Sequence, residues 1–258
     1  MHPVFLQFGG VTIYWYGVMV ALGFLASVVH WNLLGRREGR PPGFGAELAF
    51  WIMLGGILGG RLAYVFSNLH YFTAHPGEIA RIDHGGLIFY GGLFGGLAAS
   101  WLIAKARHES FLKLGDFIIT ALPLGHALGR VGCFLNGCCY GIPCRLPWAV
   151  RFPPDSHPDE VWPGQSLHPV QLYESGWNLA LYGALLFVYL RGVRPGRVAS
   201  LYFVFYGTGR FLFEFLRGDP RLRWQLLTVA QWTSLAVLAG GLILWWISSR
   251  KPKADAPS

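Results

Sequence analysis

The sequence predicts an all-α, polytopic membrane protein with about seven transmembrane helices. Its composition supports this fold class: 53% of the 258 residues are hydrophobic and only 13% are charged. Soluble globular domains carry about 25% charged residues, and the charges of this chain cluster between long apolar stretches. One soluble core would not hide so much apolar surface from water, so we expect lipid to solvate much of it.

Seven apolar windows each approach the ~20 residues that a helix needs to cross a bilayer. The start of the chain lacks a basic segment and a small-residue cleavage site, so we interpret the first window as a span and not as a signal peptide. The predicted spans are Val11–Leu34, Ala46–Phe66, Gly86–Ala104, Leu114–Leu135, Leu172–Leu190, Val198–Leu216 and Leu227–Ile247.

The distribution of Lys and Arg predicts the orientation. Three basic residues follow each of the first, third, fifth and seventh windows, which makes twelve of the 21 in the chain. They are Arg36, Arg37, Arg40, Lys105, Arg107, Lys113, Arg191, Arg194, Arg197, Arg250, Lys251 and Lys253. Because cytoplasmic loops are enriched in Lys and Arg, we expect the N-terminus outside and the C-terminus in the cytoplasm. The net charge of +8 then reflects topology, not a nucleic-acid surface.

We expect residues 1–258 to form a single transmembrane domain. Its longest polar connection, at about 136–171, is predicted on the outer face, and residues 251–258 are predicted to form a short disordered cytoplasmic tail. Many of the 35 glycines occur in pairs, which favours close helix packing. The pairs Gly85-Gly86 and Gly91-Gly92 are also compatible with non-helical backbone that lines a cavity. No internal repeat is evident, which disfavours a transporter built on inverted repeats.

Three arginines fall inside predicted spans, where a charged side chain is costly and is by default a functional candidate. They are Arg61, Arg130 and Arg210. Glu214 follows Arg210 by four residues, so the two are predicted to form an ion pair on one helix face, with Arg217 next to them. One interpretation is a neutralised pair that only holds helices together. The other is a guanidinium cluster that binds the phosphate of an anionic phospholipid.

The segments YWYG, GGLIFYGG, GRVGCFLNGCCYG, HPVQLYES and GTGRFLFEFLRGD occur in this order. They resemble the prolipoprotein diacylglyceryl transferase family, from about Thr12 to about Leu244. The resemblance implies a multi-pass enzyme of the bacterial inner membrane, with seven helices and the N-terminus outside. It implies transfer of a diacylglyceryl group from phosphatidylglycerol to the lipobox cysteine thiol of a prolipoprotein, with release of glycerol 1-phosphate. The implied partners are phosphatidylglycerol, the signal-peptide lipobox and the bilayer, without nucleic acid, metal or soluble cofactor.

The resemblance also assigns roles to residues. Arg130 and Arg210 match the family's essential arginines, and we expect them to stabilise the leaving phosphate. Tyr90 is the third expected catalytic residue. Glu174 is expected either to partner an arginine or to cap the start of the fifth span. The intramembrane Arg61 is also expected to bind substrate. The full set of residues expected to bind substrate is Tyr16, Arg61, Asn136, Gly137, Gly141, His168, Gln171, Tyr173, Glu174, Glu214 and Arg217.

The chain departs from the family pattern at three positions. Tyr90 stands where the family has a histidine, Cys133 where it has an asparagine, and Cys138 where it has an acid. A tyrosine, with an ordinary pKa of about 10, is a poor base near neutrality, so we expect Tyr90 to donate a hydrogen bond unless an arginine favours its tyrosinate. His126 and His84 are alternative bases, although we favour packing or interfacial roles for both. Water can also take the thiol proton in a cationic pocket.

All four cysteines fall in one stretch with the spacing C-x4-CC-x4-C, namely Cys133, Cys138, Cys139 and Cys144. The stretch is predicted on the outer side, where disulfides persist, and a Cys139–Cys144 disulfide is our leading expectation. Buried free thiols are the next alternative. A third alternative is a metal site, although the spacing lacks the usual C-x2-C pairs. The fourth alternative is a catalytic cysteine.

Two other functions remain open. The first alternative is a divergent paralogue that transfers weakly or uses another lipid donor. The second is a lipid or anion transporter in which the same arginines form the translocation path. The transporter predicts access from the cytoplasm and no covalent product.

Overall fold

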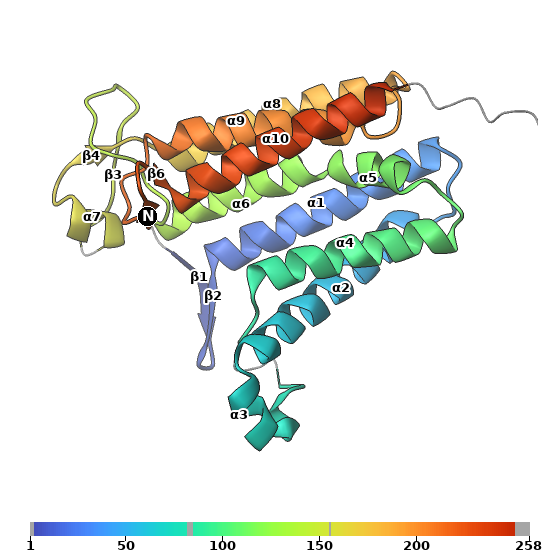
Figure 1. The fold of residues 1–258 in the computed structure, drawn as a ribbon. Coiled ribbons are helices and arrows are strands. Elements are labelled where there is room, and N and C mark those ends of the chain that lie inside the picture. Colours follow the sequence, from blue (N-terminus) through green and yellow to red (C-terminus); the bar gives the residue numbers. More distant parts are fainter. Residues whose placement is uncertain (1–2, 82–84, 155, 251–258) are drawn as a thin grey trace, which may run out of the picture. The chain divides into compact units, whose positions relative to one another are not determined.

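A computed structural model describes residues 3–81, 85–154 and 156–250 (Figure 1). The chain folds into two compact units. Unit 1 contains residues 1–27 and 116–258, and unit 2 contains residues 28–115. The single transmembrane domain stays a prediction. The expected tail at 251–258 lies outside the described residues.

Every predicted span contains a helix. The helices are α1 (Trp15–Arg37), α2 (Phe44–Ser67), α4 (Phe89–Ala106), α5 (Phe111–Ile119) followed by α6 (Leu122–Asn136), α8 (Val170–Leu190), α9 (Arg197–Glu214) and α10 (Val229–Ser249). In the described part of the chain, four segments are long and apolar enough to cross a membrane: α1, α2, the α5–α6 segment and α10. The chain is therefore mostly helical with the character of a membrane protein, while the number of seven spans and the orientation stay predictions.

The first predicted span begins too early. Residues Val11–Tyr14 form strand β2, which pairs antiparallel with β1 (Val4–Phe8). Gly9 and Gly10 join the two strands with φ angles of 53° and 83°, a conformation that glycine adopts at no steric cost and that suits a two-residue hairpin. The residues after the turn are mainly β-branched or aromatic, so the helix begins only at Trp15.

The fourth predicted span is two helices. Pro123 lies in the first turn of α6. Proline is tolerated there because the first N–H groups of a helix have no intrahelical partner, but it interrupts a helix that would run through it from α5. Asp116 in α5 is buried, and its carboxylate accepts hydrogen bonds from the backbone N–H groups of Gly196 at 2.7 Å and Ala199 at 2.8 Å. The α5–α6 segment is thereby attached to the start of α9, whose N-terminal N–H groups would otherwise lack partners.

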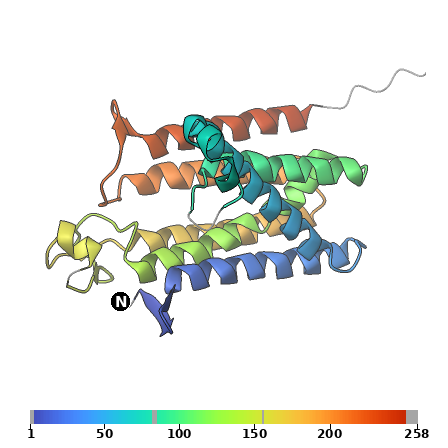
Figure 2. The same cartoon turned by 90° about the horizontal axis from the view of Figure 1, so that it is seen from below.

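Unit 1 is a bundle in which α6, α8, α9 and α10 run alongside one another (Figures 1 and 2). Small residues allow α9 and α10 to approach closely. A Cβ atom at Gly207 would lie 2.9 Å from the Ser234 carbonyl oxygen, and one at Gly241 would lie 2.9 Å from the Val204 nitrogen. Glycine at these positions is therefore a packing requirement, as expected for helices that associate in lipid.

At one end of this bundle the chain forms short connections that we call the loop end, residues 137–169 and 215–228. It contains α7 (His157–Val161) and two antiparallel strand pairs. The strands are β3 (Val150–Arg151) with β4 (Ser166–Leu167), and β5 (Arg223–Trp224) with β6 (Leu227–Thr228). A small core of Tyr140, Phe152 and Leu167 lies beneath them. The predicted loop at 136–171 is thus a packed structure.

Unit 2 is built on the crossing of α2 and α4. A Cβ atom at Gly59 would lie 2.8 Å from the Gly95 Cα atom, so the two backbones are in contact. Gly91 and Gly92 lie inside α4 in this contact, and the expectation that they permit non-helical backbone is wrong for this pair. Gly85 and Gly86 do lie outside the helix, with φ angles of 80° and 77°.

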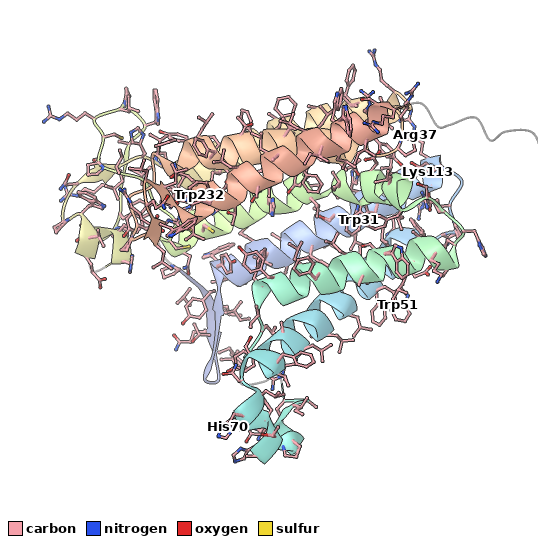
Figure 3. All side chains as sticks on the ribbon, in the orientation of Figure 1. Trp31, Arg37, Trp51, His70, Lys113 and Trp232 are labelled. Atoms are coloured by element: carbon pink, nitrogen blue, oxygen red, sulfur yellow. The ribbon has the colours of Figure 1, made fainter. Side chains whose placement is uncertain are left out.

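Two short helices, α3 (Leu69–Ala74) and the 3-10 helix η1 (Pro76–Glu78), follow α2 at one end of unit 2. Figure 3 shows His70 at this end, and Arg37 and Lys113 at the opposite end of the unit. One basic residue after the first predicted span and one after the third therefore share one end of the unit.

Candidate active site

Charged side chains from three helices and the loop end meet in unit 1. Four arginines and three carboxylates form one network of ion pairs, which we call the arginine cluster. Its members are Arg130 from α6, Glu174 from α8, Arg210 and Glu214 from α9, and Arg217, Asp219 and Arg221 from the chain after α9. With all seven groups ionised, the cluster carries a net charge of +1 (four minus three).

Glu174 lies at the centre of the cluster. Its Oε2 atom is 2.6 Å from Nε of Arg130, and its Oε1 atom is 3.6 Å from Nη1 of Arg217 and 3.9 Å from Nη1 of Arg210. The Glu174 side chain is only 5% exposed, and α8 has no side-chain cap. Of the two expected roles for Glu174, partner of an arginine and helix cap, the structure shows the first.

Glu214 holds Arg210 from the other side. The predicted i,i+4 ion pair is confirmed, with Nη1 of Arg210 2.7 Å from Oε2 of Glu214. Oε1 of Glu214 accepts a hydrogen bond from the Thr228 hydroxyl at 2.9 Å. Thr228 is also the N-cap of α10 and forms a capping box with Gln231. The orientation of Arg210 is therefore linked to the start of the next helix.

Arg217 is the most enclosed arginine, with a side chain 1% exposed. It donates two hydrogen bonds to Asp219, each 2.8 Å long, in the bidentate geometry that guanidinium favours. Burial lowers the pKa of Arg217, but the hydrogen bonds to Asp219 offset this and raise the pKa above its ordinary value. Nη1 of Arg217 and Oε1 of Glu174 are both buried, and neither forms a hydrogen bond with any of the described residues.

The segment after α6 is fixed against this cluster by its backbone. Asn136 ends α6 and is exposed, and Gly137 has a φ of 73° that lets the chain reverse. Gly141 donates from its N–H to the His168 carbonyl at 3.0 Å, and a Cβ atom there would lie 2.6 Å from the same oxygen. Gln171, fully buried, donates to the Cys138 carbonyl at 2.8 Å. These contacts hold the backbone of the segment against α8.

Three further predicted residues lie in unit 1. Nδ1 of His168 is 3.3 Å from the Tyr173 hydroxyl, which accepts a hydrogen bond from Nε1 of Trp148 at 2.7 Å. Tyr16 is in the first turn of α1 and is 45% exposed. Its backbone approaches α6 so closely that a Cβ atom at Gly132 would lie 3.3 Å from the Tyr16 Cα atom. Tyr16 thus lies beside Gly132, the residue that precedes Cys133 on α6.

Arg61 and Tyr90 belong to unit 2. The Arg61 guanidinium donates four hydrogen bonds to backbone carbonyls, those of Glu78, Ile79, Gly85 and Gly86, at 2.7–3.2 Å. Because a guanidinium has five N–H groups, these contacts favour a role in holding residues 78–79 and 85–86, and substrate binding by Arg61 stays a prediction. Tyr90 is in the first turn of α4 and is 55% exposed.

The histidines considered as bases have different outcomes. His126 stacks on Tyr206, with ring centroids 5.2 Å apart, and its Nδ1 lies 3.3 Å from the Tyr202 hydroxyl. These contacts fit the packing interpretation. His84 lies outside the described residues.

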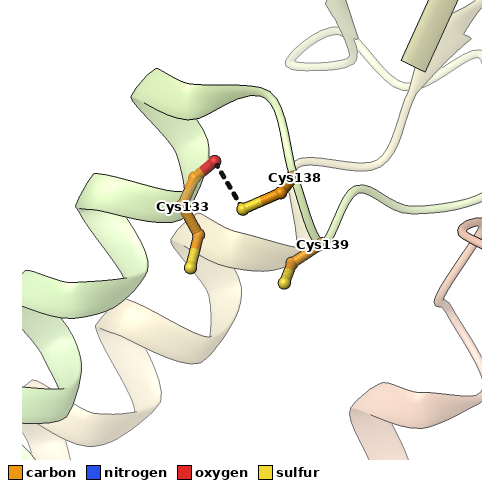
Figure 4. A group of neighbouring side chains, drawn as sticks. All are labelled: Cys133, Cys138 and Cys139. Atoms are coloured by element: carbon orange, nitrogen blue, oxygen red, sulfur yellow. Dashed lines mark hydrogen bonds between the residues drawn. The ribbon is translucent and has the colours of Figure 1, made fainter. Parts of the chain in front are cut away.

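The four cysteines are free thiols, so the expected Cys139–Cys144 disulfide is wrong for this structure. The Sγ atoms of Cys133, Cys138 and Cys139 instead lie within 4.8 Å of one another (Figure 4). Cys139 has a φ of 65° that turns it back toward the end of α6, whereas Cys144 donates from its N–H to the Ser166 carbonyl at 2.9 Å in the loop end. Hydrogen bonds from Cys133 and Cys138 lower the pKa of Cys139, and the charges of Arg217 and Arg130 lower it further.

Three members of the site were not predicted: Asp219, Arg221 and Thr228. Asp219 follows Arg217 by two residues in the RGD sequence, a spacing that permits the local bidentate pair. Thr228 precedes Gln231 by three residues, which is the sequence signature of a capping box. We find no sequence signal for Arg221, whose Nη2 atom reaches Asp219 at 3.2 Å through the loop.

The cluster suits a phosphate group. The side chains of Arg130, Arg210 and Arg221 are 22%, 15% and 28% exposed, so each is enclosed but accessible. Arg130 lies closest to Glu174 through its Nε atom, and its two terminal nitrogens carry four further N–H groups that can donate to a ligand. A net charge of +1 matches the single negative charge of a phosphodiester, and planar guanidinium groups bind phosphate oxygens in pairs.

The chain also matches known proteins over nearly its whole length. The model of the prolipoprotein diacylglyceryl transferase family matches residues 3–247. A phosphatidylglycerol–prolipoprotein diacylglyceryl transferase of Clostridium tetani is 36% identical over 246 residues, which cover 95% of this chain and 97% of that protein. The enzyme of the same name from Gloeobacter violaceus is 36% identical over 99% of this chain and 96% of its own length. The enzyme of the same name from Pseudomonas putida is 38% identical over 98% of this chain and 97% of its own length.

Proposed function

The chain belongs to the prolipoprotein diacylglyceryl transferase family, and we propose that the arginine cluster is where it carries out that reaction. It is a transferase that moves a diacylglyceryl group from phosphatidylglycerol to a prolipoprotein. The observation that carries the placement of the site is the convergence of Arg130, Arg210 and Arg217 on Glu174, within 2.6–3.9 Å.

The reaction that we propose is a displacement at carbon. The sulfur of the lipobox cysteine attacks the diacylglyceryl carbon that is bonded to a phosphate oxygen. A C–S bond forms, and the bond between this carbon and the phosphate oxygen breaks. The electron pair leaves with the phosphate oxygen, so the second product is glycerol 1-phosphate. The thiol proton passes to water or to a base. Negative charge therefore develops on the phosphate in the transition state, and donors held in place beforehand stabilise it most.

Arg130 and Arg210 are the donors to which we assign this role. Each is held by a buried carboxylate, Arg130 by Glu174 at 2.6 Å and Arg210 by Glu214 at 2.7 Å. The carboxylates fix the guanidinium planes, and the excess positive charge of the cluster attracts the anionic headgroup. Because the groups are fixed before the substrate arrives, little reorganisation opposes the reaction.

The remaining predicted residues receive three kinds of role. Gly137, Gly141 and Gln171 hold the segment after α6, as their backbone contacts suggest. We assign the exposed Tyr16 and Asn136, and the His168–Tyr173 pair, to contacts with the lipid headgroup. We assign Tyr90, from unit 2, to positioning the thiol.

We further propose seven spans in a bacterial inner membrane, with the N-terminus outside and the C-terminus in the cytoplasm. The positions of Arg37 and Lys113 at one end of unit 2 support this (Figure 3). In unit 1, Arg194 donates to the Ser249 carbonyl at 3.3 Å, which places the basic residues after α8 beside the end of α10. The arginine cluster is at the other end of α9, the outer end, where a lipobox is exposed on export.

Isotope labelling tests the function directly. Phosphatidylglycerol with 18O between the diacylglyceryl carbon and the phosphorus is incubated with the purified protein and a lipobox peptide. We expect a thioether-linked diacylglyceryl peptide without 18O, and an equal amount of glycerol 1-phosphate that carries it. Product peptide that retains 18O, or glycerol phosphate without it, would rule out the proposed displacement, and the absence of any covalent product would favour the transporter.

A further inference from the structure

A group of three thiols at the end of α6 is not used in the proposed reaction. Cys133 lies in the last turn of α6, and Cys138 and Cys139 follow the reversal of the chain at Gly137. Cys138 donates from its backbone N–H to the Cys133 carbonyl at 3.1 Å, and its Sγ lies 3.6 Å from the same oxygen. The result is that all three Sγ atoms lie within 4.8 Å of one another (Figure 4). We call these residues the thiol triad.

The backbone holds the triad together. The buried Gln171 fixes the Cys138 carbonyl at 2.8 Å, and Gly218 donates to the carbonyl of Tyr140, the residue after Cys139, at 3.0 Å. Cys139 itself has a φ of 65°, a conformation that non-glycine residues adopt rarely and that persists where the surroundings impose it. The three sulfur atoms are therefore brought together by constraints from α8 and from the chain after α9, and not by one flexible loop.

The donor set selects a class of ligand. Three sulfur atoms without a carboxylate suit soft or borderline ions such as Zn²⁺ and Cu⁺, and do not suit Mg²⁺ or Ca²⁺, which require oxygen. With Zn–S bonds of about 2.3 Å, tetrahedral geometry needs sulfur atoms about 3.8 Å apart. The triad is at most 4.8 Å across, so rotation of the side chains by less than a full rotamer closes the difference.

The surroundings fit the charge of such a complex. Three thiolates and one Zn²⁺ carry a net charge of −1, and three thiolates with Cu⁺ carry −2. Arg130 precedes Cys133 by three residues on α6, so both lie on one face of the helix. The guanidinium groups of Arg130 and Arg217 are both near enough for their charges to act on Cys139, and that of Arg130 also acts on Cys133. A negative metal–thiolate complex at this place is thus accompanied by positive groups.

We propose that Cys133, Cys138 and Cys139 form a three-thiolate binding site for a soft metal ion of the Zn²⁺ or Cu⁺ class, beside the arginine cluster. Cys133 supplies the ligand from the helix, the adjacent pair supplies two from the reversed chain, and solvent completes the coordination of Zn²⁺. On binding, the thiols release their protons to solvent. The fourth cysteine, Cys144, is not a member of the group.

The test uses the full-length protein in detergent, stripped of metal and kept reduced by a phosphine, which is not itself a thiol ligand. Zn²⁺ is titrated against a chromophoric competitor, and Cd²⁺ is titrated in parallel for its ultraviolet thiolate-to-metal charge-transfer band. We expect one ion per chain for both metals and none for Mg²⁺. Cu⁺, supplied as a chelate, decides which soft ion is preferred.

Variants identify the ligands. Cys133→Ser, Cys138→Ser and Cys139→Ser should each weaken Zn²⁺ binding by more than about a hundredfold, since loss of even an outer-shell partner costs about 10–100-fold. The matched control Cys144→Ser should bind as the wild type does. Equal weakening by Cys144→Ser, or unchanged binding in the three triad variants, would overturn the assignment.

X-ray absorption at the zinc edge of the wild-type protein makes the test independent of whether the variants fold. We expect three sulfur neighbours at about 2.3 Å. A shell of oxygen and nitrogen alone, a protein that binds no Zn²⁺, or binding that survives oxidation of the triad to a disulfide would each contradict the proposal. Because these measurements record binding and not transfer, they stand apart from the proposed reaction.

Discussion

Replacement of Glu174 by glutamine perturbs the centre of the arginine cluster with almost no change of shape. The cluster then changes from a net charge of +1 to +2. Arg130 loses the charged partner that lies 2.6 Å from its Nε, while Arg210 keeps Glu214 at 2.7 Å. Two effects on transfer follow and they oppose each other: the anionic headgroup is attracted more strongly, and Arg130 is no longer held in one orientation.

The magnitudes decide which effect dominates. Removing one partner of a buried ion pair costs roughly 3–5 kcal/mol. Because the Arg130 side chain is 22% exposed and glutamine still accepts a hydrogen bond, we expect a loss of about 1–3 kcal/mol in the free energy of unfolding. A catalytic group misplaced by about 1 Å loses about a hundredfold in rate. We therefore expect kcat to fall by about tenfold to a hundredfold, with the KM for phosphatidylglycerol unchanged or lower.

The assay is the initial rate of thioether formation on a lipobox peptide, measured over a range of phosphatidylglycerol concentrations in mixed micelles. Glu160→Gln is the matched control, because Glu160 is exposed on α7 and takes part in none of the ion pairs of the cluster. An unchanged kcat in a folded Glu174→Gln protein would refute the positioning role. A raised KM with normal kcat would show instead that Glu174 contacts the substrate.

Three further predictions concern other parts of the chain. Tyr90→Phe should lower the rate by about tenfold to a hundredfold, the scale of one or two hydrogen bonds to charged groups, and Tyr90→His should keep substantial activity; a dead phenylalanine variant would show that the phenol does more than position the thiol. Gly141→Ala should destabilise the protein by about 1–3 kcal/mol, because the new Cβ atom would lie 2.6 Å from the His168 carbonyl oxygen. The control Gly183→Ala should not destabilise it, because nothing lies within 4 Å of a Cβ atom there. Equal thermal unfolding temperatures of the two variants would contradict the packing argument. Alkylation of the metal-free, unreduced and denatured protein should label all four cysteines by intact mass, whereas two labels would show the disulfide that the structure lacks.

The helices could be predicted because each contains a long run of mainly apolar residues, and among the described residues four segments reach the length and hydropathy that a bilayer requires. The errors occur where local backbone chemistry overrides that pattern. Gly9 and Gly10 turn the chain before Val11, so an apolar segment becomes a hairpin strand. Pro123 divides a window whose mean hydropathy is that of a single membrane span. In both cases a residue with special backbone geometry sets the boundary, and a hydropathy window does not register it.

The site could be predicted only in part, because its members come from distant parts of the chain. The Arg210–Glu214 pair follows from helix periodicity alone. The contact of Arg130 with Glu174 joins α6 to α8, and only the fold brings the two together. The thiol triad was missed for a similar reason: the spacing favoured Cys139 with Cys144, whereas the left-handed conformation of Cys139 brings it back to Cys133.

Transfer by arginine variants tests the central claim most directly. Arg130→Ala and Arg210→Ala should each lower the rate of thioether formation by at least about a hundredfold to a thousandfold, the loss expected when one donor to a developing anion is removed. Lysine at either position should restore only part of it, because a point charge cannot reproduce the planar guanidinium.

Arg191→Ala provides the matched control, because Arg191 follows the opposite end of α8, about 25 Å from Glu174 along the helix axis. Its rate should equal that of the wild type. Near-normal transfer by folded Arg130→Ala and Arg210→Ala proteins would contradict the assignment of the reaction to this cluster.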